Sequence, residues 1–116
     1  MPAICFVFTT LPDAELAGKL ARNLVEMQLA ACVNLLSPCH SIYRWQGNVQ
    51  EDGEIPLIIK TTTELYPVLE SYLRQHHPYD LPEIVALDVT QGLPEYLNWV
   101  AESTGQPLFD PTLTQA

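Results

Sequence analysis

The hydrophobic pattern divides the chain into strand-like and helix-like stretches. Residues 3–10 form a short, mostly apolar run that is typical of a central strand. Pro12 favours a helix start, and residues 13–29 carry leucine, alanine and valine at helical spacing along one face. Residues 63–75 show the i, i+3, i+4 pattern of an amphipathic helix. Pro78 ends this helix, because a residue before proline avoids the α region.

The longest feature is a predicted β-hairpin that spans residues 31–63. β-branched and aromatic residues dominate both arms, and a polar turn lies at residues 46–48. Pro38 and Pro56 cannot donate to a strand ladder, so we expect a bent hairpin with a bulge or an outward edge position at each proline. At roughly 3.3 Å per residue the arms reach about 40 Å, which exceeds the need of a small sheet. We therefore expect the hairpin to pack on another copy of the chain.

Two shorter elements complete the prediction. The pattern predicts a strand over residues 83–90 and a helix over residues 93–104 that Gly105 ends. The order predicts an α+β, ferredoxin-like βαββαβ sandwich with an extra C-terminal helix and with two helices on one face of an antiparallel sheet. The other face is left bare and is too apolar to face water, which again indicates an oligomer. We assign residues 1–104 to one domain and residues 105–116 to a tail that packs loosely on a neighbour or is disordered.

Composition narrows the classes of partner. The chain of 116 residues has 14 acidic and 5 basic residues and a net charge of −9, which repels nucleic acid and anionic lipid. It contains no apolar run of about 18 residues, so we expect no membrane span. Three cysteines without a basic leader favour reduced thiols and a cytoplasmic location.

Five motifs together resemble the CutA family of divalent-cation tolerance proteins. They are Ala31-Cys32-Val33-Asn34, Ser41-Ile42-Tyr43-Arg44-Trp45-Gln46-Gly47, Leu57-Ile58-Ile59-Lys60-Thr61, His77-Pro78-Tyr79-Asp80-Leu81-Pro82-Glu83-Ile84 and Tyr96-Leu97-Asn98-Trp99. The motifs occur in family order across residues 3–103. The resemblance implies a tight homotrimer that assembles through the long hairpins, with an architecture like that of the PII signalling proteins.

The resemblance also implies a metal site at His76 and His77, because some members of the family bind copper through two equivalent histidines and a cysteine. The cysteine position falls on Thr9, which supplies no thiolate for copper(I). Adjacent residues on a helix point about 100° apart, which makes shared coordination awkward. The alternative is that both histidines cap the negative end of their helix. The cofactor we expect is copper or another divalent cation, or none.

Two other clusters contain groups that could bind metal. Cys39 and His40 point to opposite faces of an extended strand, so one ion reaches both only at a bulge; otherwise they are a semi-buried thiol beside a polar histidine. Glu51, Asp52 and Glu54 either hold a hard cation or form a solvated strand tip.

A third constellation lies on the motifs that carry the resemblance: Tyr43, Trp45, Lys60, Tyr79 and Glu83. Tyr43 and Trp45 share a face by period-two geometry, and Lys60 follows an apolar run and needs a partner, for which Glu83 is the candidate. One interpretation is an aromatic, ion-paired seam that locks the trimer. The other is a cleft between subunits in which an anionic or mixed ligand meets Lys60 and stacks on an aromatic ring.

The chain contains no sequence motif of a common catalytic site: G-x-S-x-G, the Walker loop, H-E-x-x-H and C-x-x-C are all missing. Acylphosphatase shares the expected fold but needs an arginine after the first strand, where this chain has residues 9–12, TTLP. We therefore predict a non-catalytic homotrimer for divalent-cation binding and tolerance, with copper as the expected ion. The alternative is a PII-like signalling, small-molecule sensing or scaffold protein that uses an intersubunit cleft; an enzyme is a third hypothesis.

Overall fold

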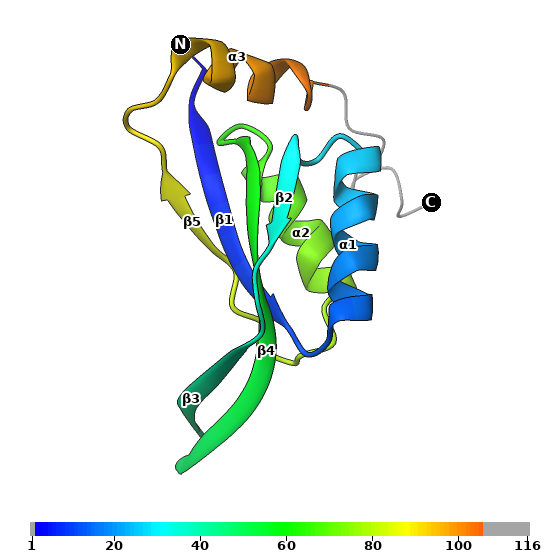
Figure 1. The fold of residues 1–116 in the computed structure, drawn as a ribbon, viewed down its shortest axis with the longest axis vertical. Coiled ribbons are helices and arrows are strands. Elements are labelled where there is room, and N and C mark those ends of the chain that lie inside the picture. Colours follow the sequence, from blue (N-terminus) through cyan, green and yellow to red (C-terminus); the bar gives the residue numbers. More distant parts are fainter. Residues whose placement is uncertain (1, 106–116) are drawn as a thin grey trace.

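A computed structural model describes residues 2–105 of the chain. The elements within this range are β1 (Ile4–Leu11), α1 (Ala14–Glu26), β2 (Cys32–Leu35), β3 (Cys39–Trp45), β4 (Asn48–Thr62), α2 (Tyr66–His76), β5 (Val85–Asp88) and α3 (Pro94–Glu102) (Figure 1). Every predicted helix and strand is present, with shifted ends. The predicted tail lies outside the described residues beyond position 105.

β4 is the central organising strand of the antiparallel sheet, whose order is β2–β4–β1–β5. Its C-terminal half pairs with β1 from Leu11↔Ile55 to Ile4↔Thr62 and with β2 on its other side. Its N-terminal half leaves the sheet and pairs only with β3, so that a hairpin projects away from the rest of the molecule (Figure 1). This order, with its two crossover helices, confirms the ferredoxin-like prediction.

The two prolines of the hairpin lie in different settings. Pro38 lies in the break between β2 and β3, whereas Pro56 stays inside the continuous 15-residue strand β4. The carbonyl of Pro56 accepts a hydrogen bond from the backbone N–H of Leu36 at 2.9 Å. The nitrogen of Pro56 faces the same side, where the ladder is interrupted between Leu35↔Leu57 and Cys39↔Glu54, so the missing N–H breaks no ladder bond. The turn residues Gln46 and Gly47 have φ of 51° and 84°, the left-handed values that a tight two-residue hairpin turn requires.

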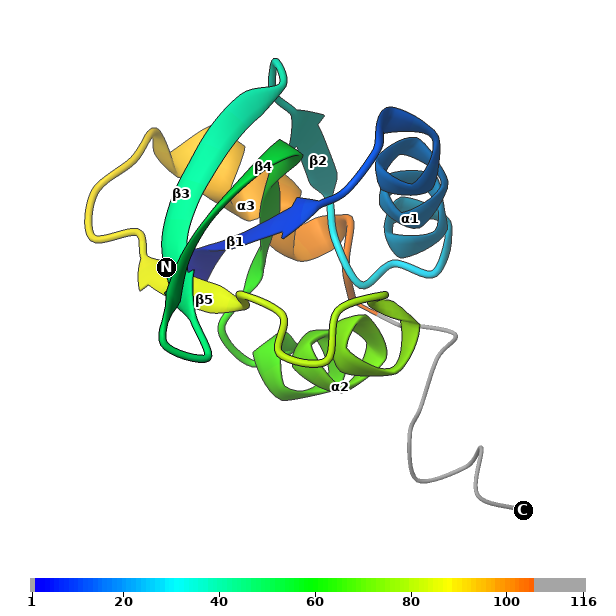
Figure 2. The same ribbon diagram turned by 90° about the horizontal axis from the view of Figure 1, so that it is seen from below.

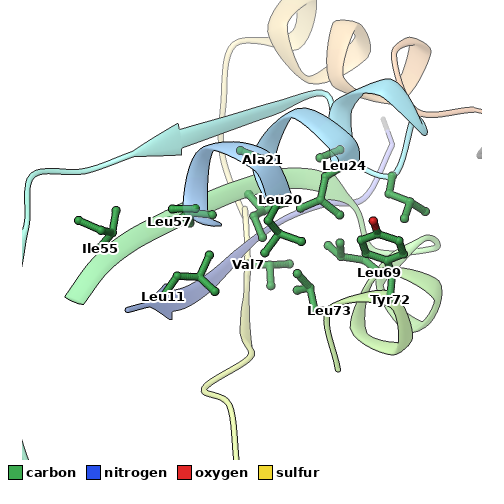
Figure 3. Packing of buried hydrophobic residues seen from close by; sticks show 14 of the residues in the cluster. Val7, Leu11, Leu20, Ala21, Leu24, Ile55, Leu57, Leu69, Tyr72 and Leu73 are labelled. Carbon is green, nitrogen blue, oxygen red and sulfur yellow. The ribbon is translucent and has the colours of Figure 1, made fainter. Parts of the chain in front are cut away.

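α1 and α2 cover one face of the sheet and bury the main core (Figures 2 and 3). Its fully buried leucine and valine side chains come from β1, α1, β4 and α2: Val7, Leu11, Leu24, Leu57, Leu69 and Leu73. Asp13 begins α1 as its N-cap, with Oδ1 accepting from the backbone N–H of Leu16 at 2.8 Å. Pro67 lies in the first turn of α2, the one part of a helix where a proline loses no hydrogen bond.

The opposite face of the sheet is only partly covered. α3 packs on one end of it, where Leu97 and Val100 bury Ile4. At the β5 edge Val85 and Leu87 remain 46% and 65% exposed. The expectation of a bare apolar face is therefore confirmed for the single chain. None of the helices within residues 2–105 is long and apolar enough to cross a membrane.

Candidate functional site

A cleft of about 910 Å³ lies where the hairpin leaves the sheet. Three segments form its walls: the end of β1, the facing strands β3 and β4, and the loop that follows α2. The side chains that matter for its chemistry are Thr10, Tyr43, Trp45, Asp52, Glu54, Tyr79, Asp80 and Glu83. Four of the five residues in the third predicted constellation therefore share one cleft.

The hairpin wall presents two aromatic rings. Tyr43 and Trp45 lie two residues apart on β3, which pairs with β4 in a regular register, and both line the cleft. They are 41% and 39% exposed. The Tyr43 hydroxyl donates a hydrogen bond to Asp52 on the neighbouring strand, and this bond to a carboxylate raises the pKa of Tyr43.

Glu54 joins the three walls of the cleft. Its Oε2 accepts one hydrogen bond from Thr10 Oγ1 at 3.0 Å and another from the Tyr79 hydroxyl at 2.9 Å. Burial of the Tyr79 phenol, with the Glu54 carboxylate beside it, holds the pKa of Tyr79 well above its usual range. This carboxylate therefore positions the loop after α2 against β1 and β4.

His77 also joins β1 to the loop after α2. Its Nε2 lies 2.8 Å from the carbonyl oxygen of Thr10, and its Nδ1 lies 3.2 Å from the backbone nitrogen of Tyr79. A carbonyl only accepts and an amide N–H only donates, so Nε2 carries the proton and the ring is neutral. Burial lowers the pKa of His77, which favours this neutral form.

His76 makes different contacts. Its ring stacks on Tyr72 with a centroid distance of 4.1 Å, and its Nδ1 is 2.9 Å from the Tyr72 carbonyl. This contact with a carbonyl of the last helical turn agrees with the capping alternative. Thr9, at the position of the family's cysteine, is fully buried in β1, and its Oγ1 has no hydrogen-bond partner in the described structure.

No three His, Cys, Asp or Glu side chains within residues 2–105 are grouped so that they could hold a metal ion. The other two clusters that the sequence suggested, around Cys39 and around Glu51, therefore form no such group either. Cys39 is near Ser41, with Sγ and Oγ 3.8 Å apart, while the neighbouring His40 is exposed. Asp52 and Glu54 face the cleft, but each accepts a hydrogen bond from a tyrosine.

Within the described part of the single chain, Lys60 does not pair with Glu83. A pairing across a subunit boundary stays a prediction. Lys60 lies on the partly covered sheet face, with Nζ 5.3 Å from the Phe6 ring centroid and 5.7 Å from that of Tyr96. Glu54 and Lys60 are six residues apart on β4, about 20 Å along an extended strand, so Lys60 cannot reach the cleft of its own chain. The cleft therefore has the opposite charge from the one that a Lys60 site would have.

Sequence reasoning missed Thr10, Asp80 and the role of Glu54 in this cleft. Thr10 and Glu54 are 44 residues apart, and Glu54 and Tyr79 are 25 residues apart. The sequence gives one indication that Asp80 belongs to the cleft: it lies with Tyr79 and Glu83 in the motif of residues 77–84. Nothing local indicates that Glu54 accepts two hydroxyl groups from distant segments.

Comparison with known proteins places this geometry in context. The family model described as CutA1 divalent ion tolerance protein matches residues 5–103. The divalent-cation tolerance protein CutA of Thermus thermophilus is 50% identical over 99 residues, which are 85% of this chain and 96% of the relative. Protein CutA of Mus musculus is 44% identical over 102 residues, which are 88% of this chain but only 58% of the mouse protein.

Solved structures agree with the sequence matches. The divalent cation tolerance protein of Thermus thermophilus superposes with a TM-score of 0.85 at 49% identity, covering 88% of this chain and 99% of that one. CutA1 of Oryza sativa gives a TM-score of 0.86 at 39% identity, covering 89% and 94%. Other relatives are described as chloroplastic, in Arabidopsis thaliana, and periplasmic, in Archaeoglobus fulgidus.

Proposed function

This chain belongs to the CutA1 family of divalent ion tolerance proteins, and on that basis we propose that it works as a homotrimer that binds a divalent cation, with copper as the first ion to test. The family is generally non-catalytic, so the chain is not expected to turn over a substrate. The family match is the observation that carries the proposal. The cytoplasmic location stays a prediction, because relatives are described from more than one compartment.

The open apolar surface supports assembly into a trimer. Val85 and Leu87 on β5 and Ile42 and Val49 on the hairpin are 46% to 68% exposed, which is unusual for a monomer of this size. Within residues 2–105, β5 pairs only with β1 and β3 pairs only with β4, so each leaves an unpaired edge. Unpaired apolar edges are ready to pair with another chain. Native mass spectrometry should give three times the 13.0 kDa chain mass, whereas a monomer would contradict the proposal.

Of the two histidines that we propose as metal ligands, His76 is the one that solvent reaches. His77 is buried and both of its ring nitrogens are engaged, so it coordinates only if the bonds to Thr10 and Tyr79 open. In a copper titration under reducing conditions, His76→Ala should weaken binding by about tenfold or more. His40→Ala is the matched control, because His40 is also exposed but lies on β3. Equal affinity of wild type and His76→Ala would remove His76 from the site.

The second candidate function is a PII-like sensor or scaffold. The observation that favours it is the cleft itself, whose volume of about 910 Å³ lies within the range of small-molecule sites. A sensor should bind an organic ligand in this cleft without copper, while a scaffold should bind neither and remain folded. Lys60→Ala is a suitable control, because Lys60 does not line this cleft in the single chain.

A further inference from the structure

Four hydrogen bonds form a closed network that joins β1, the base of the hairpin and the loop after α2. The hydroxyl groups of Thr10 and Tyr79 both donate to Glu54 Oε2, at 3.0 and 2.9 Å. The Thr10 carbonyl accepts from His77 Nε2 at 2.8 Å, and the Tyr79 backbone N–H donates to His77 Nδ1 at 3.2 Å. Each of the four residues therefore makes two bonds to other members, and we call this cycle the His77 network.

The His77 network lies within one chain and is shielded from water by that chain. Thr10 and His77 are only 7% and 9% exposed. A neighbouring subunit that covers the hairpin shields these bonds further, so the network does not depend on an open cleft. A fully satisfied network in such surroundings rigidifies the segments that it joins, and the loss of one member leaves its neighbours unpaired.

Metal coordination by His77 is incompatible with this network. Nδ1 uses its lone pair to accept from the Tyr79 N–H, and Nε2 carries the proton that it donates to the Thr10 carbonyl. Either nitrogen becomes a metal ligand only after its hydrogen bond is broken. A backbone group of the network then loses its partner, which is costly where water has little access.

The other residues of the copper site that the resemblance implies do not complete it. Thr9, at the cysteine position, is fully buried, and its alcohol is not the soft thiolate that selects copper(I). His76 stacks on Tyr72, and its Nδ1 already lies 2.9 Å from the Tyr72 carbonyl. Across residues 2–105 no three His, Cys, Asp or Glu side chains are grouped for a metal ion. The residues of this chain therefore do not fit a site of two histidines and a cysteine.

We propose that His77 positions the hairpin and is not a metal ligand. Its two hydrogen bonds hold Thr10 and Tyr79 in place, and the hydroxyl groups of these two residues in turn fix Glu54. Glu54 faces Cys39 in the register of β3 and β4, at the end of the ladder where the hairpin leaves the sheet (Figure 1). This role rests on the proposed function in one respect, because the hairpin carries the proposed trimer contacts.

A copper titration under reducing conditions separates the two histidines. His77→Ala should leave the copper affinity of the native assembly unchanged, because its ring nitrogens are occupied by the network. His76→Ala is the matched variant, since it removes the neighbouring histidine, which lies outside the network and should weaken binding. A loss of affinity in His77→Ala as large as that in His76→Ala would overturn the proposal.

Hydrogen exchange tests the positioning role without any metal. In His77→Ala, amides at the base of the hairpin, in residues 36–41 and 53–56, should exchange roughly tenfold faster, because the network no longer closes. Tyr79→Phe, which removes one hydroxyl group of the network and keeps the ring, should act in the same direction. His76→Ala should match the wild type. Unchanged exchange at the hairpin base in both His77→Ala and Tyr79→Phe would overturn the proposal.

Nitrogen-15 NMR of the histidine rings gives a third readout on the unaltered chain. His77 should show a neutral ring protonated at Nε2, and it should keep this form after one equivalent of copper(I) is added. Loss of the His77 Nε2 proton on copper(I) addition would overturn the proposal. A wild-type chain that forms no trimer or takes up no copper would instead reject the proposed function, while hydrogen exchange and the form of the His77 ring still decide the role of His77.

Discussion

At the scale of single residues, Glu54 connects the parts of the cleft. One oxygen of its carboxylate accepts hydrogen bonds from Thr10 and from Tyr79, which belong to β1 and to the loop after α2. Thr10 is 7% exposed, so its hydroxyl has little access to water if this acceptor is removed. A donor that loses its acceptor without gaining water is costly.

Glu54→Ala should therefore lower the free energy of unfolding by about 1 to 3 kcal/mol. The matched control is Glu51→Ala, which removes an exposed carboxylate of the same strand and should change stability by less than about 0.5 kcal/mol. Urea unfolding of both variants at one fixed protein concentration measures the difference. Equal stabilities would show that the two hydroxyl groups find other partners.

His77 makes stability depend on pH. Burial lowers its pKa below the ordinary 6.5, so the unfolded chain binds a proton more readily than the folded chain. This contribution to stability is complete above about pH 6.5 and is lost as the pH falls through the lower folded value. His77→Gln should flatten the stability profile between about pH 7 and 5, while His40→Gln, on an exposed site, should keep the wild-type slope. Parallel profiles for wild type and His77→Gln would contradict this assignment.

At the scale of elements, β4 links the sheet to the hairpin. Half of it is held between β1 and β2, and the other half extends with β3 as its only partner among the described strands. The two-residue turn at the tip needs left-handed backbone values, which Gly47 adopts readily at φ 84°. Residue choice at the turn therefore controls how well the hairpin closes.

Two glycine substitutions should have opposite signs. Gly47→Ala places a Cβ on a left-handed residue and should cost about 1 kcal/mol. Gly18→Ala lies inside α1, where an added Cβ meets no atom within 4 Å, and should stabilise the chain by about 0.5 to 1 kcal/mol. Thermal unfolding of both variants tests the pair. A Gly47→Ala variant as stable as the wild type would show that turn geometry does not limit stability, and a destabilised Gly18→Ala variant would contradict the expectation for α1.

At the scale of the whole molecule, the single chain leaves unusual apolar surface at the hairpin and at β5. Trp45 is 39% exposed in this structure, so its truncation alone should cost little in an isolated chain. In the proposed trimer a second copy would cover this region. The loss of stability on truncating Trp45 therefore shows whether assembly buries this side chain.

Trp45→Ala should destabilise the trimer by about 3 to 5 kcal/mol if a neighbouring subunit buries the ring. Trp99→Ala is the control, because Trp99 has a similar exposure of 44% but lies on α3. Sedimentation at low concentration and the melting temperature give the result together. A Trp45→Ala trimer with an unchanged melting temperature would place this residue outside the interface.

The order and type of the elements, the hairpin, the ferredoxin-like arrangement and the family all follow from the linear order of residues. Hydrophobic period, turn residues and helix caps are local properties, so they are visible along the chain. The position of Gln46–Gly47 at the hairpin turn is an example, and so is Asp13 at the start of α1.

The contents of the cleft, in contrast, depend on long-range packing. The bond from His77 to Thr10 joins residues 67 positions apart, and it removes His77 from the group of free metal ligands. Within one chain, the register of β4 separates Lys60 from the aromatic rings of the cleft and brings Glu54 to them. Both outcomes depend on which strands pair and in what register, which are long-range consequences of burying the core and are not set by the neighbouring residues.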